Sequence, residues 1–284
     1  MADISFTFDL EDHRAPGSTD VRYPRLTRRV LAFLDSLGAR GSFFVTGEVA
    51  EQTPDLVREI AAAGHELGFH GWYHDPLPTI GPERFREEVK RGKDLLEELG
   101  AAPVTGFRAP VFSLVPASHW ATDVLTEAGY RYSSSVLPAR SPLFGDPSQP
   151  TRAYVWPSGL LELPCPVARV GSFGLPYLGG VYLRALPHAL SAAAMRVWGT
   201  QQTLWVYCHP YDFDPDEPFW VAPEVGRVGS RLLWYNRRRA LAKVEALLRS
   251  GAAAPLGERL ASIELTPARD AAPRQAPSRG EERG

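Results

Sequence analysis

The fold is decided by the stretch Asp3-Ile-Ser-Phe-Thr-Phe-Asp9-Leu-Glu11-Asp12-His13. Residues 3–8 alternate in character and include β-branched and aromatic side chains, which predicts a short buried strand. Acidic side chains follow at once, so this strand would present carboxylates at its carboxyl end. In parallel α/β folds, active sites gather where the strands end. The stretch therefore predicts both a first strand and one edge of a site.

Similar pairs of strand and helix recur over most of the chain. Strands are predicted at 42–45, 66–69, 104–107, 160–163 and 203–207, and helices at 23–37, 54–63, 82–99, 116–127 and 231–249. The segment 133–187 is richer in Pro, Gly and aromatic residues, so we expect it to loop or to pair irregularly. The alternation is typical of a parallel α/β architecture, either a barrel or a doubly wound sheet.

Composition excludes several classes of protein. With 44% hydrophobic and 23% charged residues among 284, the chain reads as a soluble globular protein. A net charge of −2 argues against a nucleic-acid partner. No apolar run is long enough for a membrane span, and two cysteines are too few for a disulfide framework. The first residues lack a signal-peptide pattern, so we expect a cytoplasmic protein. Residues 1–266 would form the catalytic domain, and 267–284 a disordered tail.

Polar side chains follow the predicted strands at the ends where parallel strands meet. They are Asp9, Glu11 and Asp12, then His70 and His74, then Arg108, and finally His209. Two imidazoles with a carboxylate suit a divalent metal such as zinc, with one position left open for water. A further carboxylate is then available as a general base, and a distant histidine as an acid. An arginine beside the base would keep it ionised and oriented.

Each of these residues also has a plain structural interpretation. His70 and His74 share one face only if the segment is helical, and otherwise lie in a loop. The acidic run is equally compatible with a solvated turn or a helix N-cap. Arg108 could form a surface ion pair, and His209 could be a satisfied core histidine. Cys208 precedes His209 on a strand, where neighbouring side chains point to opposite faces, so a Cys–His nucleophile pair is disfavoured.

Four segments, taken in order, resemble the motifs of a known family. Thr7-Phe-Asp9-Leu-Glu11-Asp12, Gly64-His-Glu-Leu-Gly-Phe-His70-Gly-Trp-Tyr-His74, Gly106-Phe-Arg108-Ala-Pro110 and Val206-Tyr-Cys-His209-Pro210 resemble those of the polysaccharide deacetylase family, the NodB-type domain of carbohydrate esterase family 4. Gly179-Gly-Val-Tyr-Leu-Arg184 and Trp234-Tyr-Asn-Arg237 are similar to its exopolysaccharide-associated subgroup. The resemblance covers about residues 4–250.

The resemblance implies an α/β fold, a distorted (β/α) barrel, and a metal-dependent hydrolase that removes N-acetyl groups from an amino sugar. Asp9 would be the general base and Arg108 would orient and ionise it. His209 would protonate the leaving amine. Zinc is the expected metal, held by His70 and His74 with one further carboxylate from the first motif. That carboxylate is Glu11 or Asp12, and the sequence leaves the choice open.

A second choice concerns the acid that tunes His209. The family often supplies an aspartate from a fourth motif, but Tyr132-Ser-Ser-Ser135 occupies the corresponding region without an acid. Asp212 or Asp214 could take its place.

The expected substrate is an N-acetylamino sugar in a polysaccharide, an oligosaccharide or a glycolipid precursor. One alternative is a metal-free allantoinase-like or cyclic-imidase-like C–N hydrolase on the same fold. Another is a non-catalytic carbohydrate-binding protein. Aromatic side chains near the motifs either stack on sugar rings or pack in the core and rim; they are Trp72, Tyr73, Phe112, Trp156 and Tyr211.

Overall fold

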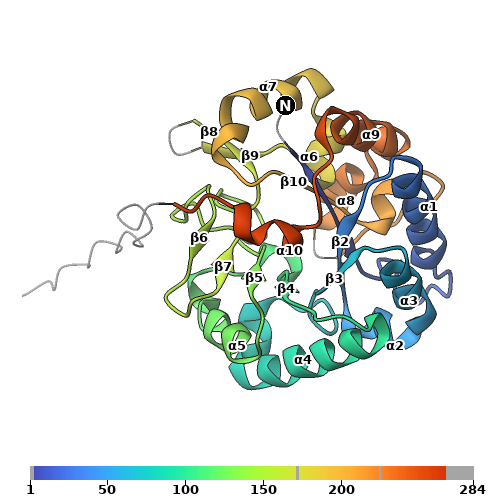
Figure 1. Ribbon diagram of the computed structural model, residues 1–284. Coiled ribbons are helices and arrows are strands. Elements are labelled where there is room, and N and C mark those ends of the chain that lie inside the picture. Colours follow the sequence, from blue (N-terminus) through green and yellow to red (C-terminus); the bar gives the residue numbers. More distant parts are fainter. Residues whose placement is uncertain (1–2, 171–172, 224, 267–284) are drawn as a thin grey trace, which may run out of the picture.

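One curled sheet organises the computed structural model, which describes residues 3–170, 173–223 and 225–266 (Figure 1). The strand order is β10-β1-β2-β3-β4-β5-β7-β6. The strands are β1 (Ser5–Leu10), β2 (Gly41–Val45), β3 (Glu66–Phe69), β4 (Gly106–Phe107), β5 (Tyr132–Ser133), β6 (Tyr154–Val155), β7 (Leu161–Glu162) and β10 (Trp205–Cys208). Neighbours are parallel except β6 and β7. The predicted distorted (β/α) barrel is confirmed as a curled, open parallel sheet.

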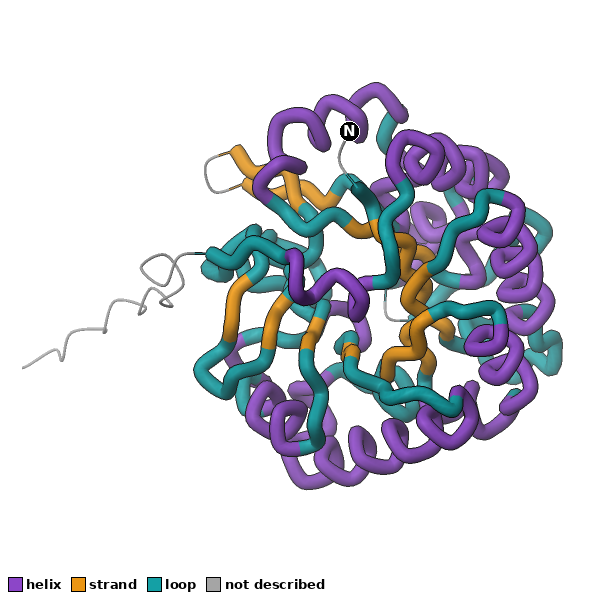
Figure 2. The backbone as a smooth tube through the Cα atoms, in the orientation of Figure 1, coloured by secondary structure: helices purple, strands orange, loops and turns teal. Residues whose placement is uncertain are grey.

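The helices lie mostly on the outer side of this sheet (Figure 2). They are α1 (Tyr23–Ser36), α2 (Gly47–Gln52), α3 (Pro54–Ala62), α4 (Leu77–Gly100), α5 (Ala121–Glu127), α6 (Gly180–Ala185), α7 (His188–Trp198), α8 (Gly226–Trp234), α9 (Ala240–Gly251) and α10 (Leu256–Arg259). One of them, α10, crosses the middle of the ring of strands in the view of Figure 1 and Figure 2. Helix α1 shows why they pack there: Leu26, Val30 and Leu34 recur at helical spacing and are buried. Among the described residues, every helix is too short or too polar to span a bilayer.

Strand β1 has two buried faces with different neighbours. Phe6 and Phe8 belong to the large core between sheet and helices. Thr7 and Asp9 point the other way, because side chains alternate along a strand. Both accept hydrogen bonds from Arg108, which lies across the interior of the curled sheet. The position of Asp9 is thus set by the alternation of the first strand.

The C-terminal half departs from the sequence prediction in one helix, while the segment 133–187 pairs irregularly as expected. The predicted helix 231–249 is wrong, because α8 ends at Trp234 and α9 begins only at Ala240. Between them Asn236 adopts a left-handed φ of 58°, which asparagine tolerates better than most residues. The segment 133–187 holds short strands, including the hairpin of β8 (Val167–Val170) and β9 (Phe173–Pro176). The predicted tail at 267–284 lies outside the described residues.

Candidate active site

The carboxyl ends of four strands deliver the polar side chains to one place. Asp9 is the next-to-last residue of β1, while His70, Arg108 and His209 directly follow β3, β4 and β10. Since these strands lie parallel in one sheet, their carboxyl ends meet at the same edge. The resulting cavity has a volume of ≈ 70 Å³ and is lined by Asp9, Glu11, His70, His74, Arg108, Ala109, Val111, Phe112, His209 and Tyr211.

Asp9 is held by a buried arginine. Arg108 is fully buried, and its Nη1 donates to Asp9 Oδ1 at 2.6 Å and to Thr7 Oγ1 at 2.7 Å. Its guanidinium carbon lies 4.2 Å from the ring centroid of Phe44 and 4.3 Å from that of Trp205. This aromatic sandwich fixes the guanidinium plane through cation–π contacts. The carboxylate of Asp9 therefore has one fixed orientation toward the cavity.

Ser134 also holds Arg108 in place, and this contact was not predicted from the sequence. Its Oγ accepts from Arg108 Nε at 3.0 Å, and Oγ of the next residue, Ser135, accepts from the backbone N–H of Ala109 at 2.8 Å. The serine run that lacks the expected acid thus supports the arginine. Only the strand order, which places β5 beside β4, reveals this contact.

Glu11, His70 and His74 form a group suited to a metal ion. One ligand atom from each lies within 4.8 Å of the others. His74 Nε2 is 2.6 Å from Glu11 Oε2, and His70 Nδ1 lies 2.8 Å from the carbonyl oxygen of Arg108. The two histidines sit in a loop, where Gly71 and His74 have positive φ, so the helical alternative for this pair is wrong.

The histidines have the chemistry of metal ligands. Burial lowers the pKa of His70 to about 4, so its ring is neutral at neutral pH. Because its Nδ1 lies against a backbone carbonyl, Nε2 is free to offer a lone pair, the second-sphere arrangement typical of ligating histidines. These donors fit a divalent cation on their residue types and mutual distances.

The structure brings Glu11, and not Asp12, into this group. Asp12 instead pairs with Arg14 at 2.9 Å. The sequence left these two carboxylates open because both follow the first strand. The geometry of the turn separates them: Glu11 is 8% exposed and contacts His74.

His209 stands on the opposite side of Asp9 from the buried arginine. Its Nε2 lies 3.8 Å from Asp9 Oδ2, and its Nδ1 lies 2.9 Å from Asp212 Oδ2. Tyr211 stacks on the imidazole, with ring centroids 4.6 Å apart and planes 9° apart. The imidazole is therefore fixed by one hydrogen bond and one stacked ring.

Asp212 also sets the charge of His209. Burial lowers the pKa of His209, but the hydrogen bond and charge of Asp212, with Glu11 and Asp9, outweigh this and raise it to about 8. The imidazole is thus largely protonated at neutral pH, as a general acid requires. Between the two open alternatives, Asp212 contacts His209, whereas Asp214 pairs with Arg22.

The aromatic residues divide between core and cavity. Trp72 and Trp156 are 1% and 7% exposed, so their interpretation as sugar platforms is wrong and they pack in the core. Phe112 and Tyr211 line the cavity, and Tyr73 is exposed beside the loop that carries the histidines. Phe112 and Tyr73 remain available to a substrate, while Tyr211, whose ring contacts His209 and Arg237, can meet it only with its edge or hydroxyl.

Comparison with known proteins agrees with this geometry. Residues 3–133 match the family described as polysaccharide deacetylase. Residues 134–256 match a domain of unknown function, DUF3473. Both segments contribute strands to the one sheet, because β10 pairs with β1.

Curated relatives share the N-terminal part of the chain. A peptidoglycan-N-acetylglucosamine deacetylase of Bacillus cereus is 26% identical over 123 residues, which are 43% of this chain and 41% of that protein. A chitooligosaccharide deacetylase of Sinorhizobium fredii is 34% identical over 104 residues, 36% of this chain and 46% of that protein. The matches thus span less than half of the length of these relatives.

Solved structures share the fold over nearly the whole chain. A Mycobacterium smegmatis structure assigned as a polysaccharide deacetylase has a TM-score of 0.59 and 21% identity, and covers 93% of this chain and 92% of its own. A second structure is a mutant of BA3943 from Bacillus anthracis, described as a CE4 family pseudoenzyme with restored enzymatic activity. It has a TM-score of 0.51 and 11% identity, and the match covers 90% of this chain and 66% of that one. Because this fold also occurs in a pseudoenzyme, activity must be argued from side chains.

Proposed function

We propose that this protein is a metal-dependent deacetylase that hydrolyses the N-acetyl group of an amino sugar in a polysaccharide, an oligosaccharide or a glycolipid precursor. The observation that carries the proposal is one cavity lined by the carboxylate of Asp9, by a three-residue group that could hold a metal ion, and by His209. A binding module would need no such combination. The family of residues 3–133 and the names of the relatives support the same reaction.

In the proposed reaction Asp9 accepts one proton and His209 donates another. Arg108 occupies Asp9 Oδ1, so Oδ2 faces the cavity and can take a proton from a water molecule. As the water oxygen bonds to the acetyl carbon, the C–N bond breaks, and the amine nitrogen takes the proton that His209 carries. The products are a free amine and acetic acid, which ionises to acetate. Asp9 is left protonated and His209 neutral, so transfer of that proton from Asp9 to the imidazole restores both groups. The separation of 3.8 Å between Asp9 Oδ2 and His209 Nε2 places both groups beside one reacting centre.

Zinc is the cation that we assign to Glu11, His70 and His74, because two imidazoles and one carboxylate leave one of its four positions open. When bound it would supply Lewis acidity, polarising the acetyl carbonyl and lowering the pKa of water. The residues themselves contribute orientation. His70 is held by the carbonyl of Arg108, so the metal group and the base share one supporting strand end.

The cavity size indicates which part of the substrate enters. Its ≈ 70 Å³ is about twice the ~30 Å³ that one water occupies in the liquid. An acetyl group fits this space, whereas a sugar ring does not. The ring would therefore remain outside, against Phe112 and Tyr211 at the mouth.

Acetate release from N-acetylglucosamine oligomers tests the proposal. Asp9→Asn should reduce kcat by at least about a hundredfold, since a general base contributes ~10²–10⁴-fold. Asp12→Asn is the matched control, because Asp12 lies in the same turn but contacts Arg14. Full activity in Asp9→Asn, or equal losses in both variants, would contradict the proposal.

A further inference from the structure

A buried arginine lies behind the acid side of the cavity. Arg184, in α6, is 1% exposed, and its Nε lies 2.8 Å from Asp212 Oδ1. The other oxygen of Asp212 bonds His209. The carboxylate is therefore shared between an arginine on one side and the imidazole on the other. Asp212 is itself 1% exposed, so solvent does not compete for either oxygen.

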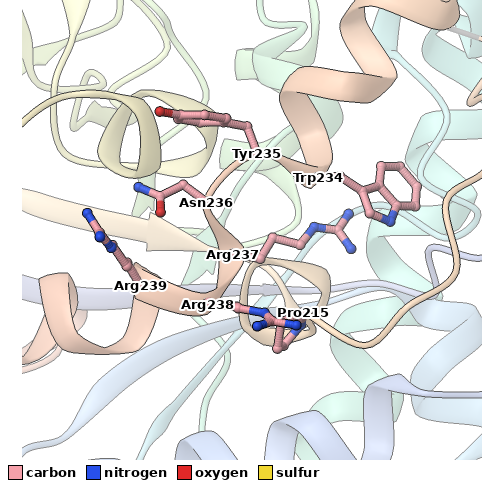
Figure 3. Close-up of a pocket in the computed structure, with 7 residues that line it drawn as sticks. All are labelled: Pro215, Trp234, Tyr235, Asn236, Arg237, Arg238 and Arg239. Carbon is pink, nitrogen blue, oxygen red and sulfur yellow. The ribbon is translucent and has the colours of Figure 1, made fainter.

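Arg184 is in turn fixed by the turn that follows α8. Its Nη1 donates to the carbonyl oxygens of Leu233 at 2.7 Å and Tyr235 at 2.8 Å. The amide of Asn236 donates back to the carbonyl of Arg184 at 2.8 Å. Figure 3 shows how the left-handed Asn236 turns the chain, so that Trp234 and Arg237 lie on one side of it. The break in the predicted helix therefore leaves the carbonyl oxygens of Leu233 and Tyr235 free to accept hydrogen bonds from Arg184.

The same turn also supports Tyr211, whose ring stacks on His209. The Arg237 guanidinium carbon lies 4.1 Å from the ring centroid of Trp234 and 5.3 Å from that of Tyr211. Its Nη1 donates to Glu217 at 2.6 Å, which fixes the guanidinium. The imidazole of His209 is consequently held on both its edge and its face by residues from the C-terminal half.

We propose that Arg184 is a positioning residue for His209, acting through Asp212, and that the turn Trp234–Arg237 holds Arg184 in place. This inference rests on the proposed function, in which His209 is the acid. A buried Arg–Asp pair contributes little net stability and is costly to break on one side only. Here the pair orients the Asp212 carboxylate, whose second oxygen contacts the His209 imidazole. We assign the burial of these two charges to that positioning role.

The charge balance around His209 is consistent with this role. Asp212 and Tyr211 face His209 from the turn after β10, and Tyr207 from β10. The remaining titratable groups come from β1, from the segment after it and from the loop after β3: Asp9, Glu11, His13 and His74. Burial raises the pKa of Asp212, but the charge of Arg184 and the contacts with His209 outweigh this and lower it to about 2. Without Arg184, Asp212 would be less well placed and less fully ionised.

The test uses Arg184→Met, with Arg184→Lys as the conservative variant and exposed Arg196→Met as the control. The pKa of His209 is measured by NMR of the imidazole protons, assigned with His209→Gln. In Arg184→Met we expect the Asp212 carboxylate to lose its fixed orientation and its contact with His209 Nδ1, so the His209 pKa should fall by about one unit and the alkaline limb of kcat/KM should move with it. A rise in the His209 pKa, which loss of a nearby positive charge alone would give, would overturn the positioning role. Arg184→Lys should recover part of the shift, because its ammonium can still meet Asp212. Arg196→Met should change neither.

The NMR titration separates this inference from the proposed function, since it needs no turnover. An unchanged His209 pKa in folded Arg184→Met would overturn the positioning role, whatever the activity. If Arg184→Met does not fold, Asp212→Asn with Arg184 intact takes its place. There, an unshifted His209 pKa removes the link through which Arg184 is argued to act.

A second, independent observation is a hollow of ≈ 510 Å³ lined by Pro215, Trp234, Tyr235, Asn236, Arg237, Arg238 and Arg239 (Figure 3). Arg238 and Arg239 are exposed, and among the described residues neither has a carboxylate within 4.0 Å. Within the described part of the chain, no acidic side chain lines the hollow. Many other arginines of the surface are paired, including Arg28, Arg40 and Arg91.

We infer that this hollow binds a phosphate-type anion. Guanidinium groups bind phosphate oxygens through charge and hydrogen bonds, and the hollow offers those of Arg238 and Arg239, neither paired with a carboxylate of the described residues, beside the exposed ring of Tyr235. Positive charge in this region also affects Lys243. Burial is the main cause that lowers the pKa of Lys243, and the charges of Arg239 and Arg184 lower it further. A phosphate group would relieve this excess of positive charge. Its source is a phosphorylated small molecule or a lipid headgroup.

Calorimetric titration with inorganic pyrophosphate tests the site. We expect binding that weakens at least about tenfold in Arg238→Gln/Arg239→Gln but not in Arg227→Gln/Arg231→Gln, a double change on exposed positions of α8. Sedimentation with phosphatidylglycerol and phosphatidylcholine vesicles distinguishes the sources. Binding only to the anionic vesicles, lost in the first variant, assigns a lipid headgroup. Absence of binding to both probes, or equal binding by all variants, would overturn the inference.

Discussion

The buried pair of Asp9 and Arg108 should show strong energetic coupling. Arg108→Met leaves the Asp9 carboxylate, 3% exposed, without its guanidinium partner, while methionine refills the slot between Phe44 and Trp205. Removing one partner of a buried pair costs about 3–5 kcal/mol. Asp9→Asn likewise leaves the buried Arg108 guanidinium without its counter-charge, but it should cost less, about 2–3 kcal/mol, because the amide oxygen can still accept from Arg108. In Asp9→Asn/Arg108→Met no charge is left unpaired.

The double variant should therefore recover at least about 2 kcal/mol relative to the sum of the two single changes. The free energy of unfolding is measured by urea titration of the four proteins, followed by circular dichroism at pH 7. Chelator is present throughout, because a bound metal would add its own stabilisation to the native state. Additivity within about 0.5 kcal/mol would refute the coupling, as would a loss below about 1 kcal/mol in Arg108→Met.

Two further predictions concern the acid and the metal group. The pKa of His209, raised from 6.5 to about 8, keeps the acid protonated up to that pH, so activity should decline above it. In Asp212→Asn the lowering effect of burial on the His209 pKa would dominate. The alkaline limb of kcat/KM should then move down by about 1.5 pH units or more, which corresponds to ~2 kcal/mol. An unmoved limb would show that another group sets it. For the metal, Glu11→Gln should weaken zinc binding by at least about tenfold in a competition titration. Asp12→Asn should leave it within about twofold, and a reversed order would assign the ligand to Asp12.

The strands and their terminal residues could be predicted from the sequence because each signal is local. Alternation in residues 5–10 sets both the strand and the side on which Asp9 lies. The residues that follow β3, β4 and β10 then meet through parallel pairing alone. This is why a site spread from Asp9 to His209 could be anticipated without a structure.

What the sequence left open depends on tertiary geometry. Glu11 and Asp12 are adjacent acids, and only the path of the turn after β1 separates the one at His74 from the one at Arg14. The choice of Asp212 over Asp214 likewise depends on the short turn after His209, which brings Asp212 back to the imidazole.

The predicted helix 231–249 failed for a similar reason. Its apolar periodicity continues through the break, so the pattern by itself indicates one helix. The left-handed Asn236 is stabilised by a hydrogen bond to Arg184, a residue about fifty positions away in the sequence. No local signal encodes that contact, although the Asn itself is one of the few residues that accept this conformation.

The most direct test of the central claim combines metal titration with product release. Purified protein is stripped with chelator, and zinc is returned in known amounts while acetate release from N-acetylglucosamine oligomers is followed. If Glu11, His70 and His74 hold one catalytic cation, activity should vanish on stripping and recover in proportion to zinc, levelling off at about one equivalent per chain. His70→Ala should bind less zinc and recover little activity. Acetate release that survives chelation, or that does not follow zinc occupancy, would contradict the account.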